Sequence, residues 1–357
     1  MPRAPILAAA LVALLAGLWA ALVRLGLDIP APGPDVVALH GLLMTLGFLG
    51  TVIGLERAVA VGGFSYAAPV VTGVGALVTI AVAPVPGVAL LTLGGVLFTV
   101  VALALLRRHG GLELATMAAG AAAWPVAGLL WLAGTPIPRL VPFLAAFLIL
   151  TIAGERLELS RLMRPGARGR ALFVVALLTF VGGVGASVPL PDAGVRAAGL
   201  GAFFLAAWLL RFDLARRTIR QAGAVRYIAI CVLGGYVWLG IGGVLWLVFG
   251  ASLGGFRYDA MLHAIFLGFV MSMILAHELI VVPAVLRVSV PFTRLFYAPL
   301  VLLHASLAAR VAGDLAGSVA VWQWAGSFNV AAVLLFATVT ATAVRCGSTR
   351  VASPRSA

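Results

Sequence analysis

Long apolar runs are the feature of this sequence that most restricts its fold. About twelve of them follow one another, each roughly 20 residues long and nearly free of charge. Lipid cannot hydrogen-bond to backbone N–H and C=O groups, so a segment that crosses a bilayer must be a helix or a strand of a closed barrel. Barrel strands would alternate apolar and polar residues, whereas these runs are apolar throughout. The sequence therefore predicts an all-α, polytopic bundle of about twelve transmembrane helices.

Composition and loop length agree with a single membrane domain. Hydrophobic residues make up 63% of the 357 residues and charged residues 10%, too few to give a soluble domain its polar surface. The connections are short and rich in Pro and Gly, as at 84–87 and 188–192, so residues 1–357 are predicted to form one transmembrane domain. We expect the spans at about 5–25, 36–60, 67–84, 88–106, 112–132, 140–160, 171–188, 195–212, 227–249, 260–282, 295–312 and 319–344.

The first run could be either a signal peptide or a membrane span. It follows Arg3 and is about 20 residues long, which exceeds the usual apolar core of a signal peptide. No clear cleavage site follows it. We therefore interpret it as an uncleaved first span.

The arginines predict an orientation. The net charge of +13 comes from arginine alone, because the chain has no lysine. If the N-terminus is inside, 19 of the 24 arginines fall on inner segments, which is the bias expected of a multi-pass protein of the inner (cytoplasmic) membrane with both ends cytoplasmic. The basic charge thus indicates a lipid bilayer as partner and not nucleic acid. The outer segments hold Arg24, Arg139, Arg196, Arg257 and Arg310.

Two histidines are predicted at equal depth near the outer face. His40 lies five residues into the second span and His263 four residues into the tenth, about 7 Å and 6 Å deep. Two such imidazoles can clamp a planar cofactor, and a b-type haem needs only axial ligands and a packed pocket. No CxxCH motif is present, so covalent c-type haem is excluded, and a structural disulfide is not expected.

Other residues near this pair have two interpretations each. Small residues of the second span could admit a flat macrocycle or could simply allow close helix packing. Arg257 and Arg310, at the outer ends of the tenth and eleventh spans, could hold haem propionates or anchor the helices at the interface. The small residues are Gly41, Gly47, Gly50 and Gly54.

The remaining histidines are candidates of other kinds. His304 lies deeper in the eleventh span and could face the cofactor or bind a second metal. His277 lies about 21 Å beyond the tenth-span ligand, so it cannot bind the same iron. With Glu278 it could form an inner metal site or a proton path together with Glu56 and Glu155; alternatively, these acids pair with Arg57 and Arg156. His109 is interpreted as solvated surface.

Two distant spans contain short similar segments, which we call the sequence echo. His40, Gly47 and Phe48 of the second span correspond to His263, Gly268 and Phe269 of the tenth. Apolar sequences match by chance often, so the echo alone does not establish a repeat.

The histidine motifs carry a resemblance to known families. His40-Gly41-Leu42-Leu43-Met44 resembles the His-Gly-x-x-Met of the second helix of haem-copper oxidase subunit I, whose histidine ligates low-spin haem. The segment from His263 to Gly268, with His277 downstream, resembles more closely the NnrS family of twelve-span membrane proteins, and so does the segment from Leu307 to Val311. That resemblance implies His40, Met44 and His263 at a haem site, with copper as a second metal.

The same resemblance implies a function and excludes another. NnrS-like proteins are linked to haem, copper and nitric oxide stress, so the expected role is electron transfer or a nitric oxide or metal stress response. The sixth and seventh spans contain no histidine, so the copper ligands of an oxygen reductase are missing and oxygen reduction is not expected. A secondary transporter and a haem or copper assembly factor remain alternatives.

Overall fold

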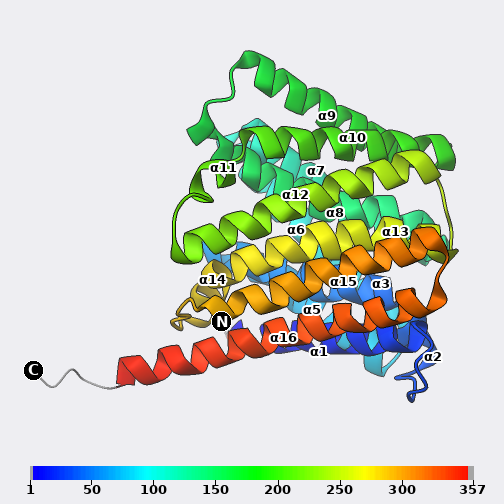
Figure 1. The fold of residues 1–357 in the computed structure, drawn as a ribbon. Coiled ribbons are helices and arrows are strands. Elements are labelled where there is room, and N and C mark those ends of the chain that lie inside the picture. Colours follow the sequence, from blue (N-terminus) through cyan, green and yellow to red (C-terminus); the bar gives the residue numbers. More distant parts are fainter. Residues whose placement is uncertain (1–2, 353–357) are drawn as a thin grey trace, which may run out of the picture.

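The chain is described by a computed structural model that covers residues 3–352 (Figure 1). These residues are helical with short connections, and no strand occurs among them. Twelve of the helical segments are long and apolar enough to cross a membrane. The all-α fold and the number of predicted spans are therefore confirmed, and the bundle is suited to a lipid bilayer.

The first six spans contain one irregular helix. The second span, residues 40–61, is a continuous helix whose middle has the wider π-helical winding, and a short helix, α2 (Pro34–Ala38), precedes it. The elements of these six spans are α1 (Arg3–Arg24), α3 (His40–Leu42), the π-helix η1 (Leu43–Gly50), α4 (Thr51–Val61), η2 (Gly63–Tyr66), α5 (Ala67–Ala81), α6 (Pro84–His109), α7 (Leu112–Leu132), α8 (Ile137–Ser160) and η3 (Arg161–Met163).

The last six spans also contain one irregular helix. The tenth span, residues 255–286, also has a π-helical middle. The elements are α9 (Ala167–Ala186), α10 (Pro191–Phe212), the short α11 (Ala215–Thr218), α12 (Gly223–Phe249), α13 (Gly255–His263), the π-helix η4 (Ala264–Met271), α14 (Ser272–Leu286), η5 (Arg294–Phe296), α15 (Tyr297–Ala316) and α16 (Val319–Ala352).

Two proline-rich stretches that the sequence placed in connections belong partly to helices. Pro84 is the first residue of α6, and Pro191 is the first residue of α10. Proline has no N–H to donate, but the first N–H groups of a helix have no intrahelical acceptor, so proline costs nothing there. The expected start of α6 at residue 88 was therefore wrong by one helical turn.

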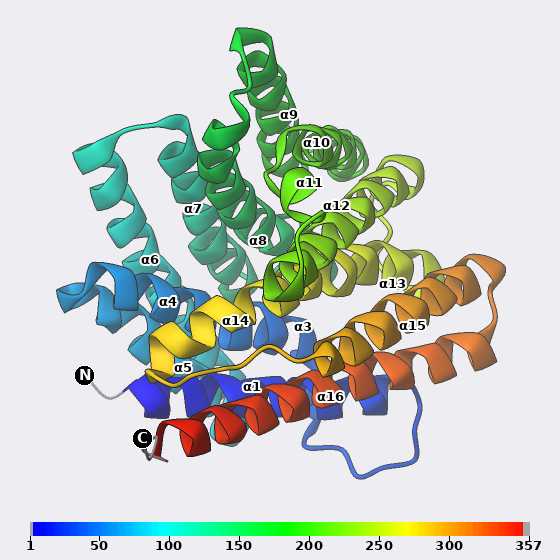
Figure 2. The same cartoon turned by 60° about the vertical axis from the view of Figure 1, so that its left-hand side comes forward.

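Neighbouring spans pack mostly against each other, and α8 lies innermost. The pairs α5–α6, α6–α7, α7–α8, α9–α10, α10–α12 and α15–α16 make the most extensive contacts. Figure 2 shows these helices fanned around the centre of the bundle. In the most apolar 18-residue stretch of each span, 83% of the residues are buried in the span of α8, compared with 33% in those of α6 and α16. The apolar sides of α6 and α16 therefore face outward, toward the surrounding lipid.

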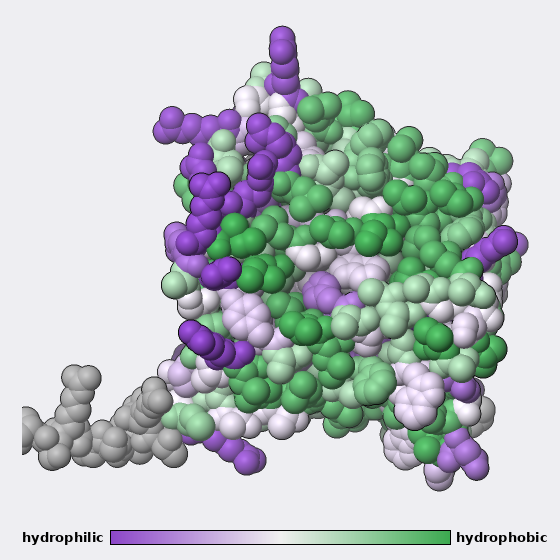
Figure 3. Space-filling view, in the orientation of Figure 1, coloured by the Kyte–Doolittle hydropathy of each residue, from purple (hydrophilic) through white to green (hydrophobic). Residues whose placement is uncertain are grey.

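The bundle has two ends with different surfaces. We call the end at which α1 begins and α16 finishes the terminal face, and the end at which α1 finishes and α13 begins the distal face (Figure 1). In Figure 3, hydrophilic side chains gather at the terminal face and apolar side chains cover the middle. The second and tenth spans run from the distal to the terminal face, so their first residues lie near the distal face.

Candidate functional site

The two histidines predicted as axial ligands hold their rings in the same way. The Nδ1 of His40 lies 2.8 Å from the carbonyl oxygen of Gly17, and the Nδ1 of His263 lies 2.8 Å from the carbonyl oxygen of Asp259. A carbonyl only accepts, so in both rings Nδ1 carries the hydrogen. In the neutral ring Nε2 then keeps its lone pair, which is the arrangement that ligand histidines require.

The fold brings these two side chains into one neighbourhood. His40 interacts electrostatically with His263, and also with Arg24 and Arg310. Their helices, α3 and α13, lie near each other in both ribbon views. Neither Nε2 has a hydrogen-bond partner or is fully enclosed in the described part of the chain. Both ligand atoms are thus available from two separate helices near the distal face.

Asp259 fixes the position of His263. Its Oδ2 lies 3.2 Å from Nδ1 of His263 and accepts a 2.7 Å hydrogen bond from Nε of Arg310, while its Oδ1 accepts from Nη2 at 2.9 Å. Arg310 also donates to Asn329 at 3.4 Å. Arg310 is therefore buried with a carboxylate partner from its own chain. From the sequence, it was instead expected to hold a haem propionate or to anchor its helix at the membrane interface.

A second carboxyl group lies beside this pair. Asp314, one turn beyond Arg310 on α15, interacts electrostatically with both Arg310 and Asp259. Asp314 is 3% exposed, and neither oxygen of its carboxyl group has a hydrogen-bond partner among the described residues. The sequence reasoning used Asp259 and Asp314 only as markers of span ends. Their four-residue spacing from His263 and Arg310 is the signal that could have identified them.

The other residues assigned to the cofactor have different surroundings. The Sδ of Met44 lies only 2.5 Å from where a Cβ on Gly17 would be placed, so Met44 packs across Gly17 on the Nδ1 side of His40. Arg257 is exposed and lies over the ring of Phe249, with 5.3 Å between its Cζ and the ring centre. Met44 thus packs against the glycine that bonds to His40, and Arg257 lies at the surface of the distal end.

The glycines of the second span mostly serve helix packing. A Cβ on Gly50 would lie 2.5 Å from the ring of Trp124, and one on Gly54 would lie 3.4 Å from Pro69. Gly47 faces alanine side chains of α5 and α1 in the same way. Only Gly41, next to His40, has nothing closer than 3.9 Å. Of the two interpretations of these glycines, close packing therefore describes three.

His304 differs from the histidine pair because both of its nitrogens are engaged. Nε1 of Trp238 donates to Nδ1 of His304 at 2.8 Å, and Nε2 lies 3.2 Å from Oγ of Ser272. Indole is only a donor, so Nδ1 must be unprotonated and Nε2 must carry the hydrogen. The hydroxyl of Ser272 accepts a hydrogen bond from Nε2 and donates its own hydrogen bond to the carbonyl oxygen of Gly268, at 2.5 Å. His304 could bind a metal only by losing one of these bonds.

His277 and the acids near the terminal face form separate interactions. His277 holds its Nδ1 2.7 Å from the carbonyl oxygen of Met273. Glu155 pairs with Arg57 at 3.0 Å, as the alternative interpretation predicted. Arg156 instead forms a two-pronged pair with Asp213, at 2.6 and 2.7 Å, which the sequence reasoning missed. No group of three or more His, Cys, Asp or Glu side chains within residues 3–352 is arranged to hold a metal ion.

The two histidine helices share an unusual backbone. Each histidine is followed by an eight-residue π-helix, η1 after His40 and η4 after His263. Each π-helix is followed directly by a hydroxyl residue, Thr51 or Ser272, that donates to the carbonyl of a glycine four residues earlier, at 2.6 and 2.5 Å. π-Helical turns occur frequently at functional sites. The Gly-Phe part of the sequence echo therefore has the same place in both π-helices, whereas the histidines precede it by seven residues in one span and five in the other.

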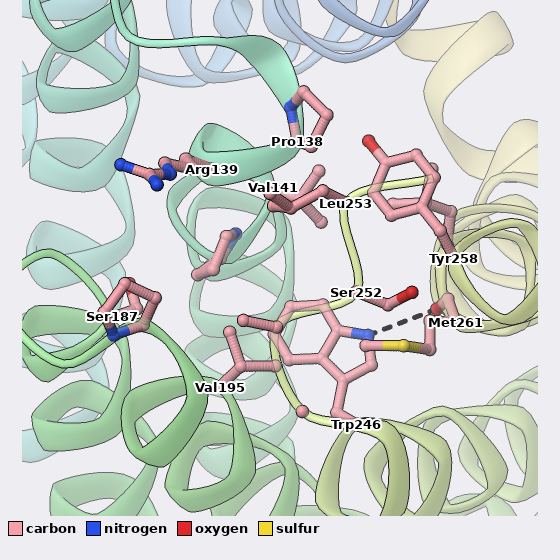
Figure 4. A pocket seen from close by; sticks show the side chains of 15 residues that line it. Pro138, Arg139, Val141, Ser187, Val195, Trp246, Ser252, Leu253, Tyr258 and Met261 are labelled. Atoms are coloured by element: carbon pink, nitrogen blue, oxygen red, sulfur yellow. Dashed lines mark hydrogen bonds between the residues drawn. The ribbon is translucent and has the colours of Figure 1, made fainter. Parts of the chain in front are cut away.

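A small pocket opens beside the histidine-bearing helix α13. Figure 4 shows its lining by Pro138 and Val141 of α8, Trp246 of α12, and Tyr258 and Met261 of α13. The indole of Trp246 donates to the carbonyl of Met261 at 3.3 Å. The lining is largely apolar, so it suits an apolar portion of a ligand and supplies no metal ligand.

Comparison with known proteins places the chain in a family. A family profile described as "Domain of unknown function (DUF8744)" matches residues 3–345. The chain belongs to this family. No curated protein and no solved structure matches the chain. The function of this DUF8744 protein is therefore inferred from the chemistry of its own side chains.

Proposed function

We propose that this protein is a haem-binding membrane protein in which His40 and His263 supply the two axial nitrogens of a b-type haem near the distal face. The observation that carries the proposal is that the two imidazole rings have the same tautomer and the same hydrogen-bonding pattern. Each gives its Nδ1 hydrogen to a carbonyl and leaves Nε2 unpartnered, and the two rings are electrostatic neighbours on different helices.

The donor set fits haem better than a lone metal ion. A six-coordinate haem needs only two protein ligands, because the macrocycle supplies the other four. In the described residues, no group of three or more His, Cys, Asp or Glu side chains is arranged as a metal-ligand set that would include these two imidazoles. When bound, a haem with two imidazole ligands would supply one-electron redox chemistry, which fits a role in electron transfer or, as in the NnrS-like proteins that the motifs resemble, in nitric oxide stress.

The surrounding residues contribute position and charge. Asp259 lies against the Nδ1 edge of His263, which fixes the tautomer and raises the basicity of Nε2. Met44 packs against Gly17, whose carbonyl oxygen accepts from Nδ1 of His40, so we expect it to help hold that ring in place. Arg310 neutralises the Asp259 carboxylate, so the site gains a carboxylate–histidine contact without an uncompensated charge.

The arginine distribution supports an orientation for the same proposal. The sequence assigns 19 of the 24 arginines to segments that lie inside if the N-terminus is inside, so the terminal face would be cytoplasmic and the haem would lie toward the outer side of the inner membrane. The redox partner would then approach from the distal face, where the exposed Arg257 lies.

Absorption spectroscopy of the purified protein tests the haem proposal. The wild-type protein should show the Soret and low-spin bands of b-type haem, and His40→Ala and His263→Ala should each lose or shift them. His109→Ala, at an exposed position, should retain the wild-type spectrum and serves as the matched control. Protein purified from cells supplied with haem, but showing no Soret band, would defeat the proposal.

A secondary transporter is a second candidate, favoured by one observation. Asp314 lies two residues before the distal end of its span, with both oxygens enclosed and without hydrogen-bond partners among the described residues, and enclosed carboxyls in membrane helices occur in transport pathways. A colourless purified protein that drives solute uptake into proteoliposomes, and loses that uptake on Asp314→Asn, would favour this alternative.

A further inference from the structure

Glu278 is a buried carboxyl group that the haem site does not use. It lies on α14, inside the tenth span, and is 4% exposed. Its Oε2 is 2.6 Å from Oγ1 of Thr340 on α16. Its Oε1 is enclosed and has no hydrogen-bond partner among the described residues. An ionised carboxylate in this position would be costly, because two oxygens would share one hydrogen-bond donor.

The hydrogen bonds of Thr340 reveal where the proton lies. Besides the Glu278 contact, Oγ1 lies 2.9 Å from the carbonyl oxygen of Phe336, four residues earlier on the same helix. Threonine hydroxyls in helices commonly donate to that carbonyl. A hydroxyl has one hydrogen and the carbonyl can only accept, so both short contacts are satisfied when Glu278 carries the hydrogen and donates it to Thr340.

The groups that face Glu278 offer it no compensating cation. Tyr227 and Cys231 of α12 lie within electrostatic range of the carboxyl, and both are fully buried. The Tyr227 hydroxyl, like Oε1 of Glu278, is enclosed, and the weakly hydrogen-bonding thiol of Cys231 is its neighbour. Among the ion pairs of the side chains that the structure describes, none includes Glu278.

Other polar groups of the neighbouring elements have partners elsewhere. His277, adjacent on α14, directs Nδ1 to the carbonyl of Met273. Arg3 of α1 donates to Tyr66 and to the carbonyls of Ala284 and Val285 near the end of α14. Tyr297 of α15 packs edge-on against the ring of Tyr227.

We propose that Glu278 is a proton-binding site that holds one exchangeable proton in the half of the membrane nearer the terminal face. The carboxyl donates this proton to Thr340, and the enclosed hydroxyl of Tyr227 is its polar neighbour. Glu278 lies eight residues before the end of α14, about 12 Å along the helix, but about 35 Å from the start of α13. Exchange therefore proceeds with the aqueous phase at the terminal face.

Infrared difference spectroscopy in nanodiscs tests the protonation state. The wild-type minus Glu278→Gln spectrum at pH 7 should contain the C=O stretch of a protonated carboxylic acid. Glu155→Gln removes an acid that is paired with Arg57, so its difference spectrum should contain carboxylate bands and the amide bands of the new glutamine, but no C=O stretch of a protonated acid. Absence of the protonated-acid band from the Glu278→Gln difference would overturn the proposal, because Glu278 would then be ionised.

Two further measurements test exchange and the role of Thr340. Transfer to D₂O should shift the Glu278 band to lower frequency while the protein stays folded, and a band that remains unshifted for hours would refute an exchangeable proton. Thr340→Val removes the acceptor and should shift the same band to higher frequency, whereas an unchanged band would mean that the carboxyl donates its proton elsewhere. Glutamine at 278 can still donate an N–H to Thr340, so the packing of Glu278→Gln should be preserved.

Discussion

Two buried arginines of this protein provide a matched test of how intramembrane charge is compensated. Arg156 and Arg310 are each 8% exposed at the side chain, and each forms a two-pronged pair with one aspartate, Asp213 or Asp259. The pairs differ in what remains when the aspartate is removed. We therefore compare Asp213→Asn with Asp259→Asn.

The structure predicts that the two substitutions differ in cost. Removing one partner of a buried ion pair costs about 3–5 kcal/mol, because the other charge remains buried and uncompensated. After Asp213→Asn, Arg156 keeps uncharged partners only, the amide oxygen of the new asparagine and the hydroxyl of Tyr236 at 3.1 Å, so its charge stays uncompensated and the full cost is expected.

Arg310 has a replacement partner in its own helix. Asp314 lies one turn away with both oxygens free of hydrogen bonds in the described residues, and it already interacts electrostatically with Arg310. Asp259→Asn should therefore cost only about 1–3 kcal/mol, the range of an incompletely satisfied polar group. The double variant Asp259→Asn/Asp314→Asn removes both carboxylates and should return the loss to about 3–5 kcal/mol.

The free energy of unfolding can be measured in mixed micelles by raising the fraction of denaturing detergent. Cys231 is fully buried and Cys346 is exposed, so in a Cys346→Ser background the reaction of Cys231 with a maleimide dye reports unfolding. The reasoning fails if Asp259→Asn destabilises as much as Asp213→Asn, or if the double variant is no less stable than Asp259→Asn alone.

Three further predictions concern the site, the topology and the chemistry. Gly17→Leu should displace the thioether of Met44 and broaden or shift the haem bands, while leaving expression intact; an unchanged spectrum would show that Met44 does not restrain His40. Reporter fusions within 28–34 and within 161–169 should report opposite sides of the membrane, and agreement between them would contradict the span assignment. Purified protein supplied with an artificial reductant should show no cyanide-sensitive oxygen consumption, which an oxygen electrode measures.

Much of the candidate site was predictable because it depends on position along single helices. The depths of His40 and His263 follow from residue counts and helical rise, and the structure places both near the distal face as neighbours. Hydrogen-bond states were not predictable in this way. Whether Nε2 is available, as in His263, or occupied, as in His304, depends on which atoms other helices present.

The sequence by itself determined that this chain is a bundle of twelve helices, because only helices satisfy the backbone of long apolar runs in lipid. That argument is local: each run must form its own hydrogen bonds whatever lies beside it. Only the tertiary structure decided which charged residues meet. Arg156 was expected to pair with one of the acids near the terminal face, but the bundle brings it to Asp213, 57 residues away. Since lipid gives the apolar surfaces of helices no strong preference for particular neighbours, such pairings follow from close packing and polar contacts between helices, which residue spacing along one helix does not encode.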